Sequence, residues 1–110
     1  MENYRVMYLR SSDGRPVGCV AMLVNRDTGV AQYQLSVLNP ADYFDRKVAR
    51  HLALGRLLEQ PKTVSMLKNA SMHDVSRDVM TALVNGKNTP ARALKAAKLW
   101  LKNRTQPVTV

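Results

Sequence analysis

The chain has 110 residues, one cysteine, 17 lysines and arginines against eight acids, and a formal net charge of +9. This length fits one domain with a core of its own, and a single cysteine excludes an internal disulfide and a multi-cysteine zinc site. No apolar run approaches the roughly 18 residues of a membrane span, and the first residues lack the apolar region of a signal peptide, so we expect a cytoplasmic protein with no membrane contact.

The first third of the sequence predicts strands. They are expected over residues 4–10, 17–24 and 30–38, with turns at 11–14 and 25–29. The second strand is apolar at nearly every position, which is typical of a central strand covered on both faces. Because short turns join antiparallel neighbours, residues 1–38 are expected to form a three-stranded β-meander.

Residues 39–59 predict the strongest helix of the chain, the central helix. Asn39 is a good N-cap, and Pro40 fits the first helical position. Phe44, Val48 and Leu52 recur at helical spacing, and we expect this stripe to pack on one face of the sheet. Gly55 continues the stripe and is read as a point of close packing against the sheet.

The last part of the chain predicts one weak strand and two helices. A short edge strand is expected over 63–67. Ser71 can cap the next helix with Asp74 three residues on, and Gly86 is expected to end it in a left-handed conformation. Thr89 and Pro90 start a final helix with Leu94, Ala97, Trp100 and Leu101 on its inner face. Residues 71–104 are thus expected to form a helical hairpin and residues 105–110 a loose tail. The whole chain is expected to be a single domain of the α+β class.

Recognised catalytic motifs are missing from the sequence. His51 and His73 lie on different predicted helices without metal-ligand spacing, and Cys19 sits inside an apolar strand, where a buried inert thiol is expected. Asp42 and Asp45 have basic neighbours, which favours a cap and a solvated ion pair over a general acid/base pair. We therefore expect a protein that is not an enzyme and that uses no cofactor or metal.

Two basic helix faces remain as candidate binding sites. The first comprises Arg46, Lys47 and Arg50 on the central helix, and the second comprises Arg92, Lys95, Lys98 and Lys102 on the last helix. Residues 79–110 contain no acid, so the second face is expected to project the stronger field. The alternative for each face is a solvated helix surface without a partner.

The pattern D-G-R-P-V-G-C-V-A, followed by a strand that runs into N-P-A-D-Y-F-D-R-K-V-A-R-H-L-A-L-G-R-L, resembles small early or accessory proteins of T7-like tailed bacteriophages. The resemblance covers roughly residues 4–59 and leaves out the last two helices. Its positions are Asn39, Pro40, Asp42, Phe44, Arg46, Lys47, Arg50, Ala53, Gly55, Arg56 and Leu57. It implies a host-takeover or anti-defence role in the host cytoplasm, exerted by binding and inhibition.

The expected function is therefore binding of an anionic target, either a nucleic acid or an acidic surface of a host protein. The alternative is a sponge that sequesters a nucleotide-type immune signal. In that case Arg46 and Arg50 would hold the ligand beside the polar strand face of Gln32, Gln34 and Ser36. A homo-oligomer is left open, and we expect the last helix to make the partner contact.

Overall fold

The computed structural model describes residues 4–38 and 45–105, with side chains described as far as residue 103. Its elements in chain order are β1 (Tyr4–Arg10), β2 (Pro16–Asn25), β3 (Val30–Val37), α1 (Arg46–Glu59), β4 (Lys62–Ser65), α2 (Met72–Asn85) and α3 (Ala91–Thr105). The predicted α+β class is confirmed, and the C-terminal helical pair lies roughly where it was expected. No helix within these described ranges has the length and apolar content to cross a membrane.

The four strands form one antiparallel sheet in the order β1-β2-β3-β4. The predicted meander is thus confirmed, and β2 is a central strand, with Val20 paired to Met7 on one side and to Leu35 on the other. The predicted edge strand is also present, shifted slightly toward the N-terminus, because Lys62–Ser65 pairs with the start of β3.

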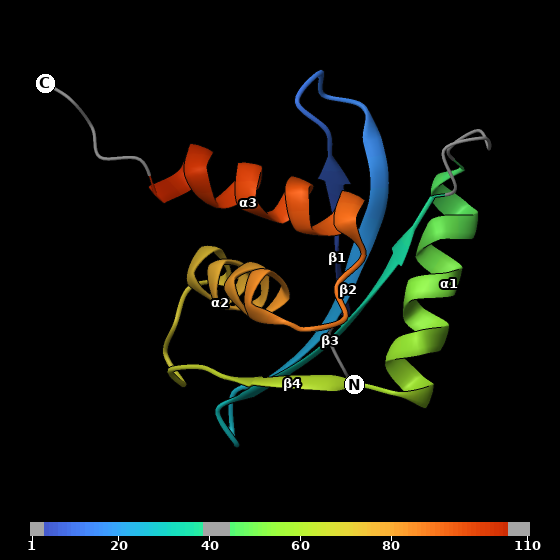
Figure 1. Ribbon diagram of the computed structural model, residues 1–110. Coiled ribbons are helices and arrows are strands. Elements are labelled where there is room, and N and C mark those ends of the chain that lie inside the picture. The colour runs from blue at the N-terminus through green and yellow to red at the C-terminus, as the bar shows by residue number, and fades with distance from the viewer. Residues whose placement is uncertain (1–3, 39–44, 106–110) are drawn as a thin grey trace, which may run out of the picture.

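The sheet lies between α1 on one side and the pair α2 and α3 on the other (Figure 1). The larger core fills the side of α2 and α3. Strand alternation sends Ala31, Tyr33 and Leu35 of β3 into this core. The helices contribute apolar side chains to it, among them Val75, Val79, Met80, Leu83, Ala93, Ala96 and Ala97, all at most 4% exposed.

The core between α1 and the sheet is smaller and built from small side chains. Ala49 and Ala53 of α1 meet Cys19 and Ala21 of β2 there, and Leu57 completes the cluster. Short side chains on both surfaces let the helix approach the sheet closely. The Ala49 carbonyl then accepts hydrogen bonds from the hydroxyl of Ser36 at 2.8 Å and the thiol of Cys19 at 3.1 Å.

The predicted orientation of the central helix is wrong. Val48 and Leu52 are 54% and 46% exposed, and a Cβ added to Gly55 would meet no atom within 4 Å. Periodicity identifies an apolar face but does not say what covers it, and here the alanine face is the one that packs against the sheet. Phe44, the first member of the predicted stripe, lies outside the described residues.

The start of the central helix also differs from the prediction. Asp45 has an extended backbone and caps α1, because its carboxylate accepts hydrogen bonds from the backbone N–H groups of Lys47 and Val48. The helix therefore begins at Arg46. The predicted cap at Asn39 and Pro40 lies outside the described residues.

The start of α2 is as predicted, whereas its end differs from the prediction. Ser71 caps the helix by accepting from the N–H of Asp74 at 3.1 Å, which confirms the expected start. Gly86 follows its end with a φ of −72°, so the predicted left-handed conformation is wrong. The reason for a glycine is steric: an added Cβ would lie 2.8 Å from the Thr89 hydroxyl, which donates to the Leu83 carbonyl. The predicted tail from residue 106 onward lies outside the described residues, whereas Thr105 is the last residue of α3.

Candidate functional site

A hollow of about 430 Å³ lies between α3 and the end of the hairpin formed by β1 and β2. We call it the α3 groove. Its lining consists of Arg10, Ser11, Ser12, Val17, Arg92, Lys95, Ala96, Lys98, Leu99 and Lys102. Five of these ten residues are cations and none is an acid, so the groove is a concave surface of one charge sign with apolar walls.

The α3 groove brings together all four cations that the sequence placed on the last helix. Lys95, Lys98 and Lys102 are exposed and recur at spacings of three and four residues, which puts them on one side of the helix. Arg92 is half-buried at the start of the same side. The prediction that these cations share a surface therefore agrees with the described positions.

Both arginines of the α3 groove are held by backbone carbonyls. Arg92 donates from Nη1 to the Leu38 carbonyl at 2.6 Å, and Arg10 donates from Nη1 to the Gly14 carbonyl at 2.9 Å. A guanidinium has five N–H donors in a fixed fork, so each keeps further donors for a ligand. A neutral carbonyl leaves the positive charge in place, and the two contacts limit the motion of both side chains.

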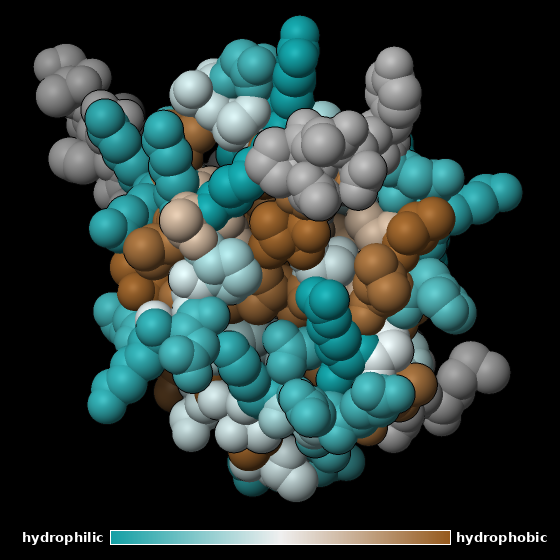
Figure 2. Space-filling view, turned by 45° about the vertical axis from the view of Figure 1, so that its right-hand side comes forward, coloured by the Kyte–Doolittle hydropathy of each residue, from teal (hydrophilic) through white to brown (hydrophobic). Residues whose placement is uncertain are grey.

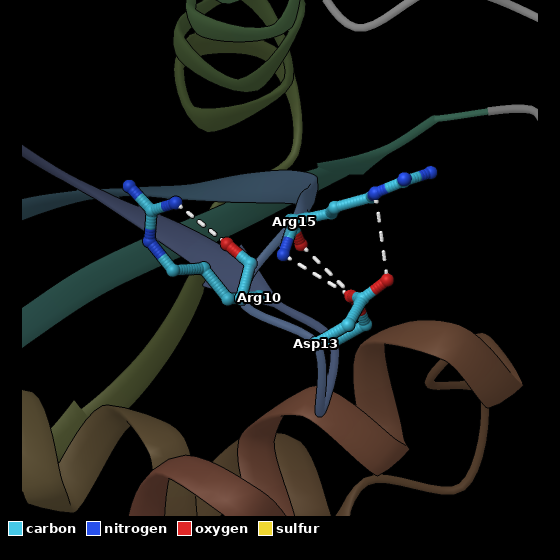
Figure 3. Close-up of polar contacts among 5 residues, drawn as sticks. Arg10, Asp13 and Arg15 are labelled. Atoms are coloured by element: carbon cyan, nitrogen blue, oxygen red, sulfur yellow. Dashed lines mark hydrogen bonds and ion pairs between the residues drawn. The ribbon is translucent and has the colours of Figure 1, made fainter.

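An acid stands near the groove, at the tip of the hairpin (Figure 3). The Asp13 carboxylate accepts from the Ser11 hydroxyl and from the N–H of Arg15 at 3.2 Å, and its other oxygen lies 3.5 Å from Nε of Arg15. The Ser11 hydrogen bond first, and then the Arg15 N–H, lower the pKa of Asp13 below its ordinary value. The partners of Asp13 are therefore Ser11 and Arg15 rather than the groove cations.

A second hollow of about 280 Å³ adjoins the α3 groove. The two share Arg10, Ser11, Ser12, Ala96 and Leu99, and the second one adds Tyr8, Leu9, Gly14, Trp100 and Asn103. The half-buried Trp100 ring lies 6.0 Å from the ring of His73, at an interplanar angle of 30°. Apolar and aromatic surface thus continues from the cationic groove along α3.

The basic residues of α1 do not join this site. Arg46, Lys47 and Arg50 are exposed on the opposite side of the sheet from α3. The Arg46 guanidinium lies over the Tyr8 ring, 5.2 Å from its centroid, in a cation–π contact. None of the three lines either hollow, although Tyr8, over which Arg46 lies, is part of the second one.

The polar strand face expected to line a nucleotide pocket beside Arg46 and Arg50 holds α1 in place instead. The Gln34 amide donates to the Gln60 carbonyl at 2.8 Å, and the buried Ser36 donates to Ala49. Gln32 lines a different hollow, beside Arg5 and Arg26. Ser36 and Gln34 are therefore engaged in contacts at α1 and its C-cap, and Gln32 faces a hollow that Arg46 and Arg50 do not line, so the sponge hypothesis stays a prediction.

The remaining candidate groups of the sequence are Cys19 and the two histidines. Cys19 is fully buried as predicted, and burial raises the pKa of its thiol above the ordinary 9.0. His51 and His73 lie on α1 and α2. No group of three or more His, Cys, Asp or Glu residues suited to hold a metal ion occurs among the described residues.

Arg10, Ser11 and Ser12 were missed by the sequence reasoning. Arg10 ends the first strand just before a turn, a position at which an arginine is unremarkable. Only the crossing of α3 beside the hairpin turns it into a member of the site. The one available signal was local: a polar Ser-Ser pair after a basic strand end.

The comparisons with known proteins give no family for this chain: no protein-family model, no characterised protein and no solved structure matches it. The resemblance to phage accessory proteins therefore stays a prediction.

Proposed function

We propose that the protein is a non-enzymatic nucleic-acid-binding protein that holds a single-stranded segment in the α3 groove. The observation that carries this proposal is the lining of the groove: Arg10, Arg92 and three lysines, no acid, and apolar walls between them. Lysine and arginine neutralise phosphates and release their condensed counterions, which supplies most of the sequence-independent affinity for nucleic acid.

Single strands fit this lining better than the flat acidic surface of a protein. Val17, Ala96 and Leu99 give the groove apolar walls, and the adjoining hollow adds Trp100. Proteins that bind single strands combine a cationic track for phosphates with apolar and aromatic surface for the bases. This combination favours a single strand over a surface that offers carboxylates alone.

The test is fluorescence anisotropy with a labelled 12-nucleotide DNA, the same RNA sequence and the corresponding duplex. We expect the single strands to bind more tightly than the duplex. The logarithm of the binding constant should fall with the logarithm of salt concentration with a slope of about −3.5, since single strands give about −0.7 for each neutralised phosphate and the groove has five cations.

A matched pair of charge reversals locates the site. Lys95→Glu with Lys98→Glu should abolish binding, whereas Lys68→Glu with Lys87→Glu changes the net charge equally at exposed positions outside the groove lining and should retain most of it. Equal losses from both pairs would contradict the groove and leave only non-specific charge attraction. No binding of any nucleic acid at about 50 mM salt, where exposed charges are weakly screened, would overturn the proposal.

A second candidate is supported by the size of the hollow. A volume of about 430 Å³ lies within the roughly 300–1,000 Å³ of small-molecule sites, so a free signalling nucleotide could occupy the same cations. Calorimetry with a panel of cyclic dinucleotides and ADP-ribose compounds distinguishes the two. Tight binding of one compound with no oligonucleotide binding favours a sponge.

The host-takeover or anti-defence role is supported only by the sequence resemblance of residues 4–59, and the α3 groove lies largely in the part of the chain that this resemblance leaves out. Either ligand suits such a role, because sequestering a nucleic acid or a nucleotide signal requires binding without turnover.

A further inference from the structure

The second hollow beside the α3 groove differs from the groove in the chemistry of its lining. Among the described residues, ten line each hollow, and neither set contains an acid. Five of those in the groove are cations, whereas the one cation of the second hollow is Arg10, which both linings share. The rest of the second lining is apolar, aromatic or neutral and polar. Positive charge is therefore concentrated in the groove, and the second hollow suits an uncharged group next to it.

The size of the second hollow fits one aromatic ring system. Its volume of about 280 Å³ lies just below the roughly 300–1,000 Å³ of sites for drug-sized molecules, so it suits a base without its sugar and phosphate. Ala96 and Leu99 belong to both linings, and the two hollows therefore meet along α3. A strand whose phosphates lie in the groove can thus place a base in the second hollow.

Trp100 gives the second hollow an aromatic wall that is held in position by its packing. The side chain is half-buried and packs against the larger core. The ring of His73 on α2 lies 6.0 Å from it, centroid to centroid. These contacts limit rotation of the indole, so little side-chain entropy is lost when a base stacks on it. Stacking on an aromatic side chain is open to every base, because each has a π-face.

Asn103 adds hydrogen-bonding groups to the same hollow, at an exposed position three residues beyond Trp100. Residues three apart are neighbours on a helix surface, with roughly 5–6 Å between their Cβ atoms. The side-chain amide carries two N–H donors and one carbonyl acceptor. Of the four bases, adenine is the one that an asparagine amide pairs with in the usual bidentate contact, donating to a ring nitrogen and accepting from the exocyclic amine.

We propose that the second hollow is a nucleobase subsite, in which one base of a bound single strand stacks on Trp100 and presents its edge to Asn103, with adenine as the preferred base. The inference rests on the proposed binding of a single strand in the α3 groove. It assigns the phosphates to the cations of the groove and the base preference to Asn103. Arg10, at the border of the two hollows, belongs with the phosphate contacts.

Tryptophan fluorescence tests the stacking directly, because Trp100 is the single tryptophan of the chain. The probes are six-unit abasic sugar–phosphate strands that carry adenine, guanine, cytosine, thymine or no base at the third position. All five have the same charge, so their binding should depend on salt with the same slope. The adenine strand should quench the fluorescence and bind roughly tenfold more tightly than the strand without a base, which is the usual gain from stacking one base.

The outcomes separate the subsite from the proposed function. Equal binding of all five strands, with unchanged fluorescence, would overturn the subsite while strand binding in the α3 groove remains. If neither these strands nor the ordinary 12-nucleotide strands bind, both proposals are overturned. Tighter binding of guanine than of adenine would overturn the assignment to Asn103, since guanine is the base that arginine prefers.

A matched pair of asparagine variants tests the base preference. Asn103→Ala should weaken the adenine strand roughly tenfold, the usual discrimination from one bidentate pair, and should leave the strand without a base unchanged. Asn85, the last residue of α2, is also exposed and lies outside both linings, so Asn85→Ala should keep the preference. Adenine preference that persists in Asn103→Ala would overturn the role of this residue.

A matched pair of leucine variants tests whether exposed apolar surface in general binds the bases. The side of the molecule that carries α1 also exposes apolar surface among hydrophilic side chains (Figure 2), and Leu52 on α1 is 46% exposed. Leu52→Gln should bind all five strands like the wild type. Leu99→Gln, in the lining of the second hollow, should weaken the four strands with a base severalfold and spare the strand without one. Circular dichroism checks the fold of both variants, and equal losses from the two would overturn the subsite.

Discussion

Arg92 on α3 donates a hydrogen bond of 2.6 Å to the carbonyl of Leu38, which follows the last residue of β3. This contact joins segments 54 residues apart, and it comes from the same side chain that lines the start of the α3 groove. Arg92 thus has two roles, one in fixing the position of α3 against the sheet and one in the positive field of the groove.

Arg92→Ala should therefore lower both stability and binding. A hydrogen bond from a charged group contributes about 1.5–3 kcal/mol, and because Arg92 is only half-buried we expect a loss of about 1–2 kcal/mol in the free energy of unfolding. Lys95→Ala, at an exposed position on the same helix, should change stability by less than about 0.5 kcal/mol while also weakening binding. Urea unfolding and oligonucleotide titration of both variants check this, and equal urea midpoints would contradict the structural role.

The strands and their order followed from local signals. Alternation in residues 30–38 and the short turns specify antiparallel neighbours, and the apolar run of residues 17–24 specifies the central strand, because a strand covered on both faces needs apolar side chains on both. Because these signals are local, the sequence alone was sufficient to predict the strands of the sheet and their order.

The orientation of α1 could not be predicted in the same way. The helix has two candidate inner faces, one with the larger apolar residues Val48 and Leu52 and one with the smaller Ala49 and Ala53. The sheet surface opposite it contains Cys19, Ala21 and Ser36, which favours close approach by small side chains over insertion of Leu52. Which face packs inward depends on the sheet surface opposite the helix, and helical periodicity carries no information about that surface.

The candidate site was predictable to the extent that it lies on one helix. The spacing of Lys95, Lys98 and Lys102 places them on one side of α3 whatever the fold. Arg10 joins them only because α3 crosses the hairpin, and the separation of Arg46 and Arg50 from the groove depends on the sheet between them. Both facts depend on how the helices and strands pack in three dimensions, which the local sequence does not specify.

Gly86→Ala should destabilise the turn between α2 and α3. The new Cβ would lie 2.8 Å from the Thr89 hydroxyl and displace it from the Leu83 carbonyl, to which it donates at 2.6 Å. We expect a loss of about 1 kcal/mol, the usual contribution of one such hydrogen bond. A double-mutant cycle measures the coupling: in a Thr89→Ala background the same change should cost much less. Strictly additive costs would show that the hydroxyl and the glycine are independent.

Gly18→Ala should be far more damaging than Gly86→Ala. An added Cβ at Gly18 would overlap the Ser36 carbonyl oxygen in the neighbouring strand β3, and a paired backbone cannot rotate away as a side chain can. We expect a loss above about 3 kcal/mol, which falls in the exceptional range for a single substitution. Gly14→Ala is a useful comparison, because its site is open but its φ is +84°, so only local strain of about 1–2 kcal/mol is expected. Thermal melting of the two variants gives the ranking, and a milder effect at Gly18 would contradict it.

Alkaline unfolding should report the buried thiol of Cys19. Burial raises its pKa above the ordinary 9.0, so the folded state keeps the proton that the unfolded chain loses. This stabilising contribution is complete below pH 9 and is lost as the pH rises from there through the pKa of the folded protein, with a slope of up to about 1.4 kcal/mol per pH unit.

Cys19→Ala provides the control for that measurement. Tyr33, whose pKa is also raised by burial, is present in both proteins, so its contribution cancels in the comparison. Urea unfolding between pH 8 and 10.5 should show the wild type losing stability faster than Cys19→Ala. Parallel pH profiles would mean that the thiol does not titrate differently in the two states.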